Sequence, residues 1–356
     1  MPHPYSSLPA EAFWRTAVAE PGLPGLRGLW RARWPLRPSD PVATLGSCFA
    51  QRIGRALRGQ GWHWLDAEPA PRGLDEAQAE AHGYGLFSAR VGNVYTAAQL
   101  RQWVEWALDE RASPPTLWWR DDRVYDPFRP GIEPAGFASE REALVLRHAT
   151  QKALARALRD AHWLVFTLGL VEGWQDQRDG VVLPLAPGVV AGSFDPERHV
   201  WRQWRHAEIA GDLLATLELL KRHNPALRLL LSVSPVPLTA TCSGQHVLVA
   251  STAAKATLRA VAAELADTHP DIDYFPAYEV IASHPARARF FDTNLRTVTA
   301  EGVENVMRHF FAGLGDVPPT PARAAPTLAP ATAPDTADAE AQCDEALLDA
   351  FRPKTR

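Results

Sequence analysis

Short and almost wholly apolar runs recur along this chain, and segments with helical spacing separate them. The clearest run is 162–168 (HWLVFTL), which ends at Gly169, and another is 229–233 (LLLSV). A strand that is apolar along its whole length is typically buried on both faces, as in a parallel sheet that helices cover on each side. The alternation therefore predicts an α/β fold built on a parallel sheet.

The same pattern extends from residue 41 to residue 312. Strands are predicted at 41–45, 62–65, 162–168, 229–233 and 272–275. Helices are predicted at 49–57, 97–108, 139–160, 207–222, 251–268 and 300–312. Two stretches lack either pattern and are predicted to be irregular: 113–136, as an insertion or a hairpin, and 175–202.

Composition divides the chain into three parts. Residues 1–40 are predicted to be an N-terminal extension that packs on the core, and residues 41–316 to be the α/β domain. Residues 317–356 are rich in proline and alanine and cannot bury an apolar face, so they are predicted to be a disordered tail. Residues 341–351 have an alternative interpretation as a helical turn or two that docks as a peptide. The tail is also a candidate site for a protein partner.

The charge pattern argues against several classes of partner. The net charge is −4, with 37 basic and 41 acidic residues interspersed, so no nucleic-acid partner is expected. No run approaches the roughly 18 apolar residues of a membrane span, and a cytoplasmic location is expected. The three cysteines, Cys48, Cys242 and Cys343, form no CxxC pair, which is typical of a reducing compartment. With no zinc-ligand spacing and no cofactor motif, neither a metal nor a cofactor is expected.

Cys48 is the strongest candidate nucleophile, ahead of its neighbour Ser47. Gly46-Ser47-Cys48 follows the predicted strand 41–45 and opens the helix after it. A thiol in the first turn of a helix lies near unpaired backbone N–H groups and the positive end of the helix dipole, which favour the thiolate. The alternative is that Cys48 packs as a small apolar residue beneath the sheet.

A nucleophilic cysteine also needs a base and a group that stabilises an oxyanion. Gly92 and Asn93 suit the oxyanion hole, although they could equally form the turn that enters a helix. His246 is the candidate base, with His284 as an alternative. Glu172 could orient the base or bind substrate, or be a cap or ion-pair residue. Several of these segments follow predicted strands, so we expect them to meet at the carboxyl edge of the sheet.

The pentapeptide Gly46-Ser47-Cys48-Phe49-Ala50 resembles the signature from which the GSCFA-domain family takes its name. Further segments resemble that family in the same order, up to about Phe311. They are 92–96 (GNVYT), 166–170 (FTLGL) with Glu172 and Trp174, 233–241 (VSPVPLTAT), Lys255 with 258–259, and 274–276 (YFP) with Tyr278 and Glu279. The family is similar to SGNH/GDSL hydrolases, which implies a three-layer α/β/α, doubly wound parallel sheet of flavodoxin-like type with irregular insertions.

The resemblance also implies roles for individual residues. Cys48 would take the place of the superfamily's serine, Gly92-Asn93 that of its oxyanion-hole block, and Glu172 that of an asparagine. The fourth block of the superfamily is an Asp-x-x-His pair, and here Asn294 and Thr297 stand at those two positions. Neither side chain can act as a general base near neutral pH.

These observations predict an acyl-transfer enzyme, an esterase or O-acyltransferase, that acts on a small molecule or glycan, most simply a carbohydrate or glycoconjugate. Cys48 would attack the acyl group and His246 would carry the proton, with Ser47 and Glu172 as further catalytic candidates. The predicted substrate-binding residues are Tyr95, Trp174, Ser234, Glu279, Asn294 and Arg296. One alternative is a non-catalytic protein that binds or scaffolds glycans or other ligands. Another, ranked lower, is a glycosyltransferase of polysaccharide synthesis.

Overall fold

The centre of the molecule is a four-stranded, wholly parallel sheet. The computed structural model describes residues 3–315 and 343–352. The strands lie in the order β1-β4-β8-β9. Their bounds are β1 Val42–Gly46, β4 Trp163–Leu168, β8 Arg228–Val233 and β9 Ile272–Phe275. The prediction of an α/β fold with a parallel sheet is confirmed.

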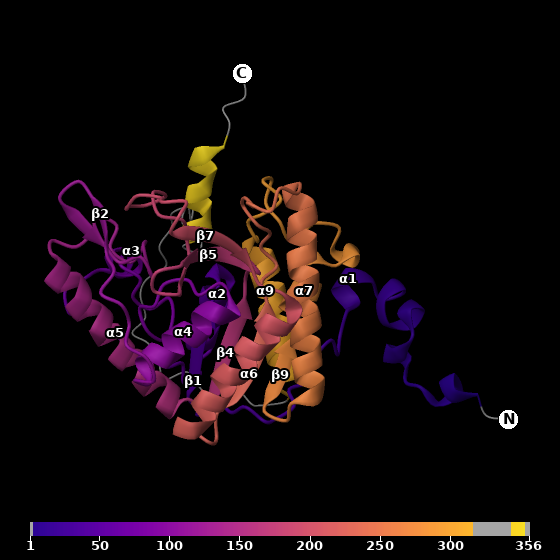
Figure 1. Cartoon of the computed structure of the whole chain (residues 1–356). Coiled ribbons are helices and arrows are strands. Elements are labelled where there is room, and N and C mark those ends of the chain that lie inside the picture. The colour runs from indigo at the N-terminus through magenta and orange to yellow at the C-terminus, as the bar shows by residue number, and fades with distance from the viewer. Residues whose placement is uncertain (1–2, 316–342, 353–356) are drawn as a thin grey trace, which may run out of the picture.

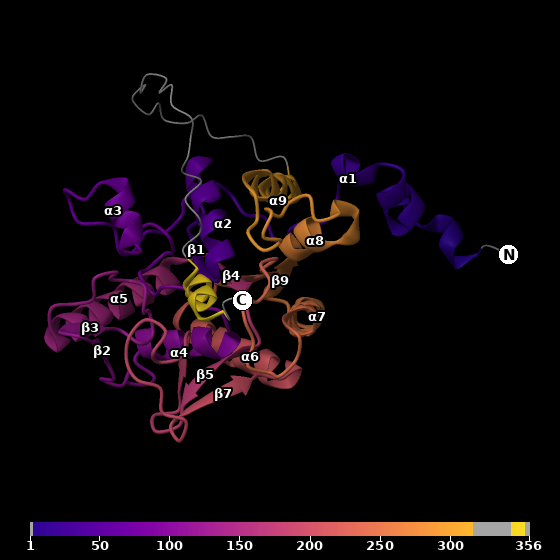
Figure 2. The same ribbon diagram turned by 90° about the horizontal axis from the view of Figure 1, so that it is seen from above.

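Helices cover both faces of this sheet (Figure 2). One face packs against α2 (Cys48–Gly59), α8 (Ala277–Ala282) and α9 (Ala300–Gly313). The other packs against α4 (Ala97–Ala107), α6 (His206–His223) and α7 (Val247–Thr268), with α5 (Glu140–Asp160) beside α4 and α6. These bounds agree with the predicted helices to within a few residues at each end.

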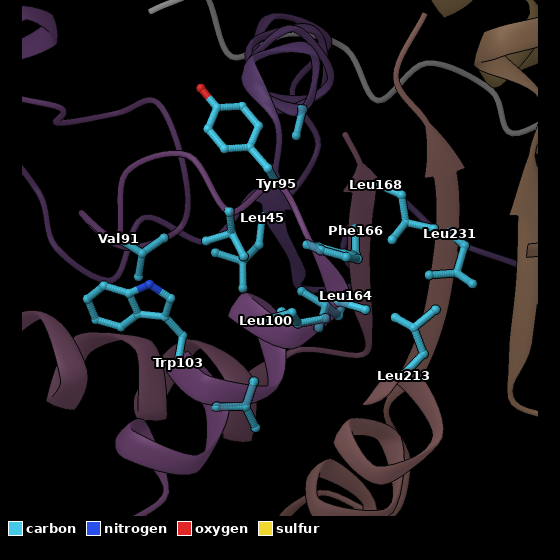
Figure 3. Packing of buried hydrophobic residues seen from close by; sticks show 14 of the residues in the cluster. Leu45, Val91, Tyr95, Leu100, Trp103, Leu164, Phe166, Leu168, Leu213 and Leu231 are labelled. Carbon is cyan, nitrogen blue, oxygen red and sulfur yellow. The ribbon is translucent and has the colours of Figure 1, made fainter. Parts of the chain in front are cut away.

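Alternating strand residues supply the two cores, as the pleat requires. In β4, Phe166 belongs to the core on the α4 and α6 side, whereas Val165 belongs to the core on the α2 and α9 side. Figure 3 shows the first of these cores, where Leu45 and Phe166 of the sheet lie near Leu100 of α4. Both faces of each strand are therefore apolar, which explains the uninterrupted runs in the sequence.

The predicted strand at 62–65 is reduced to one parallel bridge between Val42 and Trp64. The N–H of Val42 donates to the carbonyl of His63 at 2.9 Å, and the N–H of Leu65 donates back to Val42, on the edge of β1 away from β4. After Leu65 the chain turns toward the loop before α4, where the N–H of Ala67 bonds to the carbonyl of Ser88. This departure limits the ladder to a single bridge.

The segment 175–202 is not irregular. It contributes to an antiparallel sheet in the order β6-β5-β7, with β5 at Glu172–Asp176, β6 at Val181–Leu183 and β7 at His199–Gln203. Trp174 pairs with Leu183 on one side and Trp201 on the other. Figure 1 shows β5 and β7 above the carboxyl edge of the parallel sheet. The stretch 113–136 holds a hairpin, β2 (Trp118–Arg120) with β3 (Arg123–Tyr125), as one alternative predicted.

The N-terminal segment extends away from the body (Figures 1 and 2). It holds short helical turns at Pro4–Ser7, Ala10–Ala12 and Arg15–Ala19, then α1 (Gly22–Gly25). Two later tryptophans pack on the core: Trp30 against Phe275, with ring centroids 5.2 Å apart, and Trp34 against Trp163, at 5.6 Å. Two short helices, α3 (Glu76–Ala81) and the 3₁₀ helix η4 (His284–Ala286), complete the domain.

The C-terminal segment differs from the predicted disordered tail where the structure describes it. Asp344–Phe351 form a 3₁₀ helix, η5, and Glu345 in it is buried. Figures 1 and 2 show η5, in yellow, over the carboxyl edge of the sheet near α2 and β5. The docking alternative for residues 341–351 thus matches these residues, and the remainder of the segment 317–342 lies outside the described residues. Throughout the two described ranges, no helix combines the length and apolarity needed to cross a bilayer.

Candidate functional site

The turn from β1 into α2 places Cys48 at the carboxyl edge of the sheet. Gly46 has φ +137°, and a Cβ there would lie 2.6 Å from the backbone oxygen of Thr167, so only glycine fits. The N–H of Ser47 donates to that same oxygen at 3.0 Å, and α2 begins at the next residue. Cys48 is therefore the first residue of α2, where its side chain is buried but lines a cleft.

The loop before α4 brings Asn93 beside this turn, as the sequence predicted. The N–H of Val94 donates to the carbonyl of Gly46 at 2.9 Å, and Gln51 of α2 donates to Oδ1 of Asn93 at 3.2 Å. Gly92 has φ +70°, which allows the loop to bend here. The Asn93 amide thus lies near the first turn of α2, with its oxygen bonded to Gln51 of that helix.

Tyr95 connects this loop to the end of β4. Its carbonyl accepts the N–H groups of Gly169 and Leu170 at 2.9 and 3.1 Å. In Figure 3 its phenol points away from the apolar core, and the hydroxyl lies 3.9 Å from Sγ of Cys343. A Cβ on Gly169 would come within 3.0 Å of the Ser47 side chain, so the ends of β1 and β4 pack closely here.

Lys255 is a site residue to which the sequence analysis assigned no role. It is 3% exposed on α7, and Nζ donates to the carbonyl of Gly169 at 2.7 Å. Burial lowers the pKa of this amine to about 8, against the opposing charges of Glu345 and Cys48. The signal in the sequence was a lysine on the otherwise small or apolar face of a helix, beside Ala254 and Leu258.

Arg296 reaches the cleft from a loop that Asn294 shapes. Oδ1 of Asn294 accepts the N–H groups of Arg296 and Thr297 at 2.9 and 2.8 Å, and its Nδ2 donates to Oγ1 of Thr297 at 2.9 Å. Asn294 and Thr297, which stand at the two positions of the Asp-x-x-His pair, therefore form a hydrogen bond with each other in an exposed turn. Arg296 donates to the carbonyl of Pro237 at 3.2 Å and lines the Cys48 cleft.

The C-terminal segment covers these groups. Nδ2 of Asn93 donates to Oδ2 of Asp344 at 2.9 Å. The guanidinium of Arg296 donates to Sγ of Cys343 at 3.6 Å and lies 3.4 Å from Oε2 of Glu345. Cys343 and Ala346 line the same cleft as Cys48. The segment thus occupies the space that a ligand of Cys48 and Asn93 would need.

The two thiols Cys48 and Cys343 share a hydrogen bond. This bond favours a neutral Cys48, whereas the sequence pattern predicted a thiolate there. Its donation to Cys343, and then its burial, raise the pKa of Cys48 well above the usual range. The same hydrogen bond, together with the charge and hydrogen bond of Arg296, lowers the pKa of Cys343 to about 5 in spite of burial. With the segment docked, the thiolate is therefore on Cys343, whereas the sequence predicted it on Cys48.

A second cavity lies next to the first, around the start of β5. Glu172 lines it with Trp174 and Trp201, and Glu345 and Leu348 of the C-terminal segment close its other side. The carboxylate of Glu172 accepts from Oγ1 of Thr241 at 3.0 Å and from the indole of Trp201 at 3.3 Å. Burial raises the pKa of Glu172, and these hydrogen bonds oppose it.

Other predicted site residues lie elsewhere. His246 is exposed, and its Nδ1 accepts the N–H of Leu248 at 3.2 Å as a cap of α7. His284 stacks on Trp14 with ring centroids 5.1 Å apart. Among the described residues, no histidine lines the Cys48 cleft. The structure therefore does not bring either candidate imidazole to the thiol.

Of three further candidates, two have structural partners. Glu279 pairs with Arg259 and accepts the hydroxyl of Tyr274 at 2.7 Å, and it does not line the cleft. Ser234 is buried at the end of β8, where its Oγ accepts the N–H of Val236 at 3.3 Å. Ser47 is buried, and within the described residues its Oγ has no hydrogen-bond partner.

Comparison with known families gives one match. The model of the GSCFA family matches residues 41–310, which span the parallel sheet, the Cys48 turn and the Arg296 loop. No curated protein sequence matches this chain.

Proposed function

This chain belongs to the GSCFA family, and we propose that it is an acyl-transfer enzyme, an esterase or O-acyltransferase, whose nucleophile is Cys48. The observation that carries the proposal is the position of Cys48, in the first turn of α2 and facing a cleft that it shares with Arg296. The likeness to SGNH hydrolases belongs to the same proposal, since those enzymes carry their nucleophile at the corresponding turn.

Lys255 replaces His246 as the proposed base. A buried amine with a pKa of about 8 is neutral in a substantial fraction of molecules near neutral pH, so it can accept a proton. Its charge acts on Cys48, and its hydrogen bond to Gly169 fixes it behind the Ser47 turn. The proton of Cys48 would pass to Nζ when the thiol attacks.

The reaction divides into two half-reactions. The sulfur of Cys48 forms a bond to the acyl carbon, and the carbonyl electrons move to its oxygen, which the Asn93 amide and the free N–H groups of the first turn of α2 stabilise. Collapse breaks the ester bond, and the leaving alkoxide takes the proton from Lys255. Water, or the hydroxyl of an acceptor, then attacks the thioester in the same manner and restores the thiol.

A carbohydrate or glycoconjugate substrate is proposed because of the second cavity. Trp174 and Trp201 offer flat apolar faces to the C–H groups of a sugar ring, and Glu172 offers acceptors for its hydroxyls. Glu345 of this cavity lies 3.4 Å from the guanidinium of Arg296, which lines the Cys48 cleft. A sugar bound there could place an O-acyl group at the thiol.

The test uses the Cys48→Ala and Cys48→Ser variants with an aryl acetate and an acetylated sugar as substrates. Acid quenching and intact-mass analysis should show one acyl group on the wild-type protein, on the peptide of Cys48. Turnover should fall at least about 100-fold in Cys48→Ala. Cys242→Ser is the matched control with the aryl acetate, because Cys242 is exposed and is not among the residues described as lining the Cys48 cleft. Full turnover by Cys48→Ala would refute the proposal.

A second candidate is a ligand-binding protein without acyl chemistry. It is favoured by the occupied cleft and by the absence of histidine from the residues described as lining it. In that case no acyl group would appear on Cys48 in any variant, yet glycans would bind saturably. Trp174→Ala would then weaken binding, whereas Cys48→Ala would not.

A further inference from the structure

We propose that Cys48 and Cys343 are a redox pair whose disulfide fastens the C-terminal segment Cys343–Phe351 over the cleft. The pairing itself does not depend on acyl transfer. Its consequence, the reversible loss of the nucleophile, rests on the proposed function.

The docked segment aligns the two thiols by contacts other than their own. Asp344 accepts from Asn93 at 2.9 Å, and Glu345 lies 3.4 Å from the guanidinium of Arg296. Glu345 is 6% exposed, and the aliphatic Leu348 lines the neighbouring cavity. Two contacts therefore hold the segment directly after Cys343, whose thiol lines the same cleft as Cys48.

Cys48 and Cys343 line one cleft, and each shifts the pKa of the other. A disulfide bond of about 2 Å requires the two sulfur atoms to approach each other, and a short 3₁₀ segment can make this movement more readily than a strand of the central sheet. The chain offers a third cysteine for comparison. Cys242 is exposed on the far side of Glu172, in the lining of the second cavity.

The surroundings of Cys343 suit the first step of oxidation. Arg296 donates to its sulfur at 3.6 Å, and the hydroxyl of Tyr95 lies at 3.9 Å. Together with the donor Cys48 they lower the pKa of Cys343 to about 5. A thiolate beside a second thiol is the arrangement of redox-sensing cysteines.

With a hydroperoxide as oxidant, the electrons and atoms balance in two steps. The Cys343 thiolate attacks the peroxide: an S–O bond forms, the O–O bond breaks, and the leaving oxygen takes a proton to become water or an alcohol. The sulfur of Cys48 then attacks the sulfenic acid, the S–S bond forms, and hydroxide leaves with the Cys48 proton as water. The two thiols lose two electrons in total, and the peroxide gains them.

The test uses the full-length, fully reduced protein at low concentration. It is treated with a small excess of hydrogen peroxide, free thiols are blocked with N-ethylmaleimide, and a tryptic digest is analysed without reductant. The three cysteines fall in different tryptic peptides, so each pairing has its own mass. We expect the peptides of Cys48 and Cys343 joined with the loss of two hydrogens, and their separation by dithiothreitol.

Two variants make the test specific. Cys343→Ser should lose the cross-link, and Cys242→Ser should form it to the wild-type extent. Arg296→Gln should form it more slowly at neutral pH, because the thiolate loses its cation. Recovery of Cys48 and Cys343 both blocked after oxidation would overturn the inference. A pairing of Cys48 with Cys242, or a Cys48–Cys343 pair between two molecules, would overturn it as well.

The cross-linking test and the acylation test can succeed or fail independently of each other. If the cross-link forms but no acyl group ever appears on Cys48, the redox pair stands and acyl transfer fails. If Cys48 is acylated and no cross-link forms, acyl transfer stands and the redox pair fails. If both hold, oxidation should abolish acylation in the wild-type protein but not in Cys343→Ser.

Discussion

Replacement of Gly46 by alanine should destabilise the whole domain, because the methyl group has no space at the β1–α2 turn. Its Cβ would lie 2.6 Å from the carbonyl oxygen of Thr167, 2.7 Å from its nitrogen and 3.0 Å from its Cα. All three are backbone atoms of β4, which pairs with β1 at this point. They cannot rotate away as the end of a flexible side chain could.

The magnitude follows from two penalties. A φ of +137° is strained for any residue with a Cβ, at a cost of about 1–3 kcal/mol. Forcing β1 away from β4 to relieve the overlap costs about 1–3 kcal/mol more. It would also lengthen the hydrogen bond from Ser47 to Thr167, now 3.0 Å. We expect a loss of about 4 kcal/mol in the free energy of unfolding.

The assay is urea unfolding followed by tryptophan fluorescence, with Gly211→Ala as the matched control. Gly211 lies within α6, is exposed, and has no heavy atom within 4 Å of a built Cβ. Alanine should stabilise that helix by about 0.5–1 kcal/mol. If Gly46→Ala lost less than about 1 kcal/mol, the turn would have a different backbone from the one described, and the placement of Cys48 would lose its support.

Three further predictions concern single side chains. Asp126 is fully buried; burial alone would raise its pKa, but two arginines lower it. Asp126→Asn should lose about 3–5 kcal/mol in urea unfolding at pH 7. The difference should begin to shrink below about pH 4, where the carboxylate of the unfolded chain takes up a proton, and should continue to shrink as the pH falls through the lowered pKa of the folded protein. Lys255→Met should keep the fold, as measured by circular dichroism, but should slow the acylation of Cys48 at least about 100-fold and remove the dependence of the acylation rate on pH near 8. Unchanged acylation would exclude Lys255 as the base. Cys343→Ser should lower the pKa of Cys48, because a neutral hydroxyl replaces the thiolate whose charge and hydrogen bond raise it, and should speed the alkylation of Cys48 by iodoacetamide at pH 7; an unchanged rate would contradict the thiol pairing.

The sequence predicted the parts of the fold that local patterns specify. Each parallel strand is apolar on both faces, and each long helix carries an amphipathic pattern. The sequence patterns did not predict the sheet β6-β5-β7 because its strands are short, two of them are half-buried, and turn residues such as Gly180 and Pro184 lie between them. The position of Trp174 depends on its pairing with Leu183 of β6 and Trp201 of β7.

The sequence predicted Cys48 because it follows a strand, and Asn93 because a glycine and an amide precede a helix. The structure brings these two residues together. The proposed base could not be found by residue type alone, since histidine is the usual choice and here His246 is a helix cap. The hydrogen bond from Asn93 to Asp344 could not be predicted from the sequence, because 251 positions separate the two residues.

The charge balance of the cleft explains why the docked segment and a reactive Cys48 exclude each other. Arg296 and Lys255 are the cations whose charges act on the two thiols and Glu345. With the segment docked, Cys343 takes the thiolate and raises the pKa of Cys48 through a hydrogen bond and its charge. Without the segment, Arg296 and the positive end of α2 act on one thiol, so the pKa of Cys48 should fall and its proton should pass more readily to a neutral Lys255. The position of the segment would then decide whether the cleft is closed or nucleophilic.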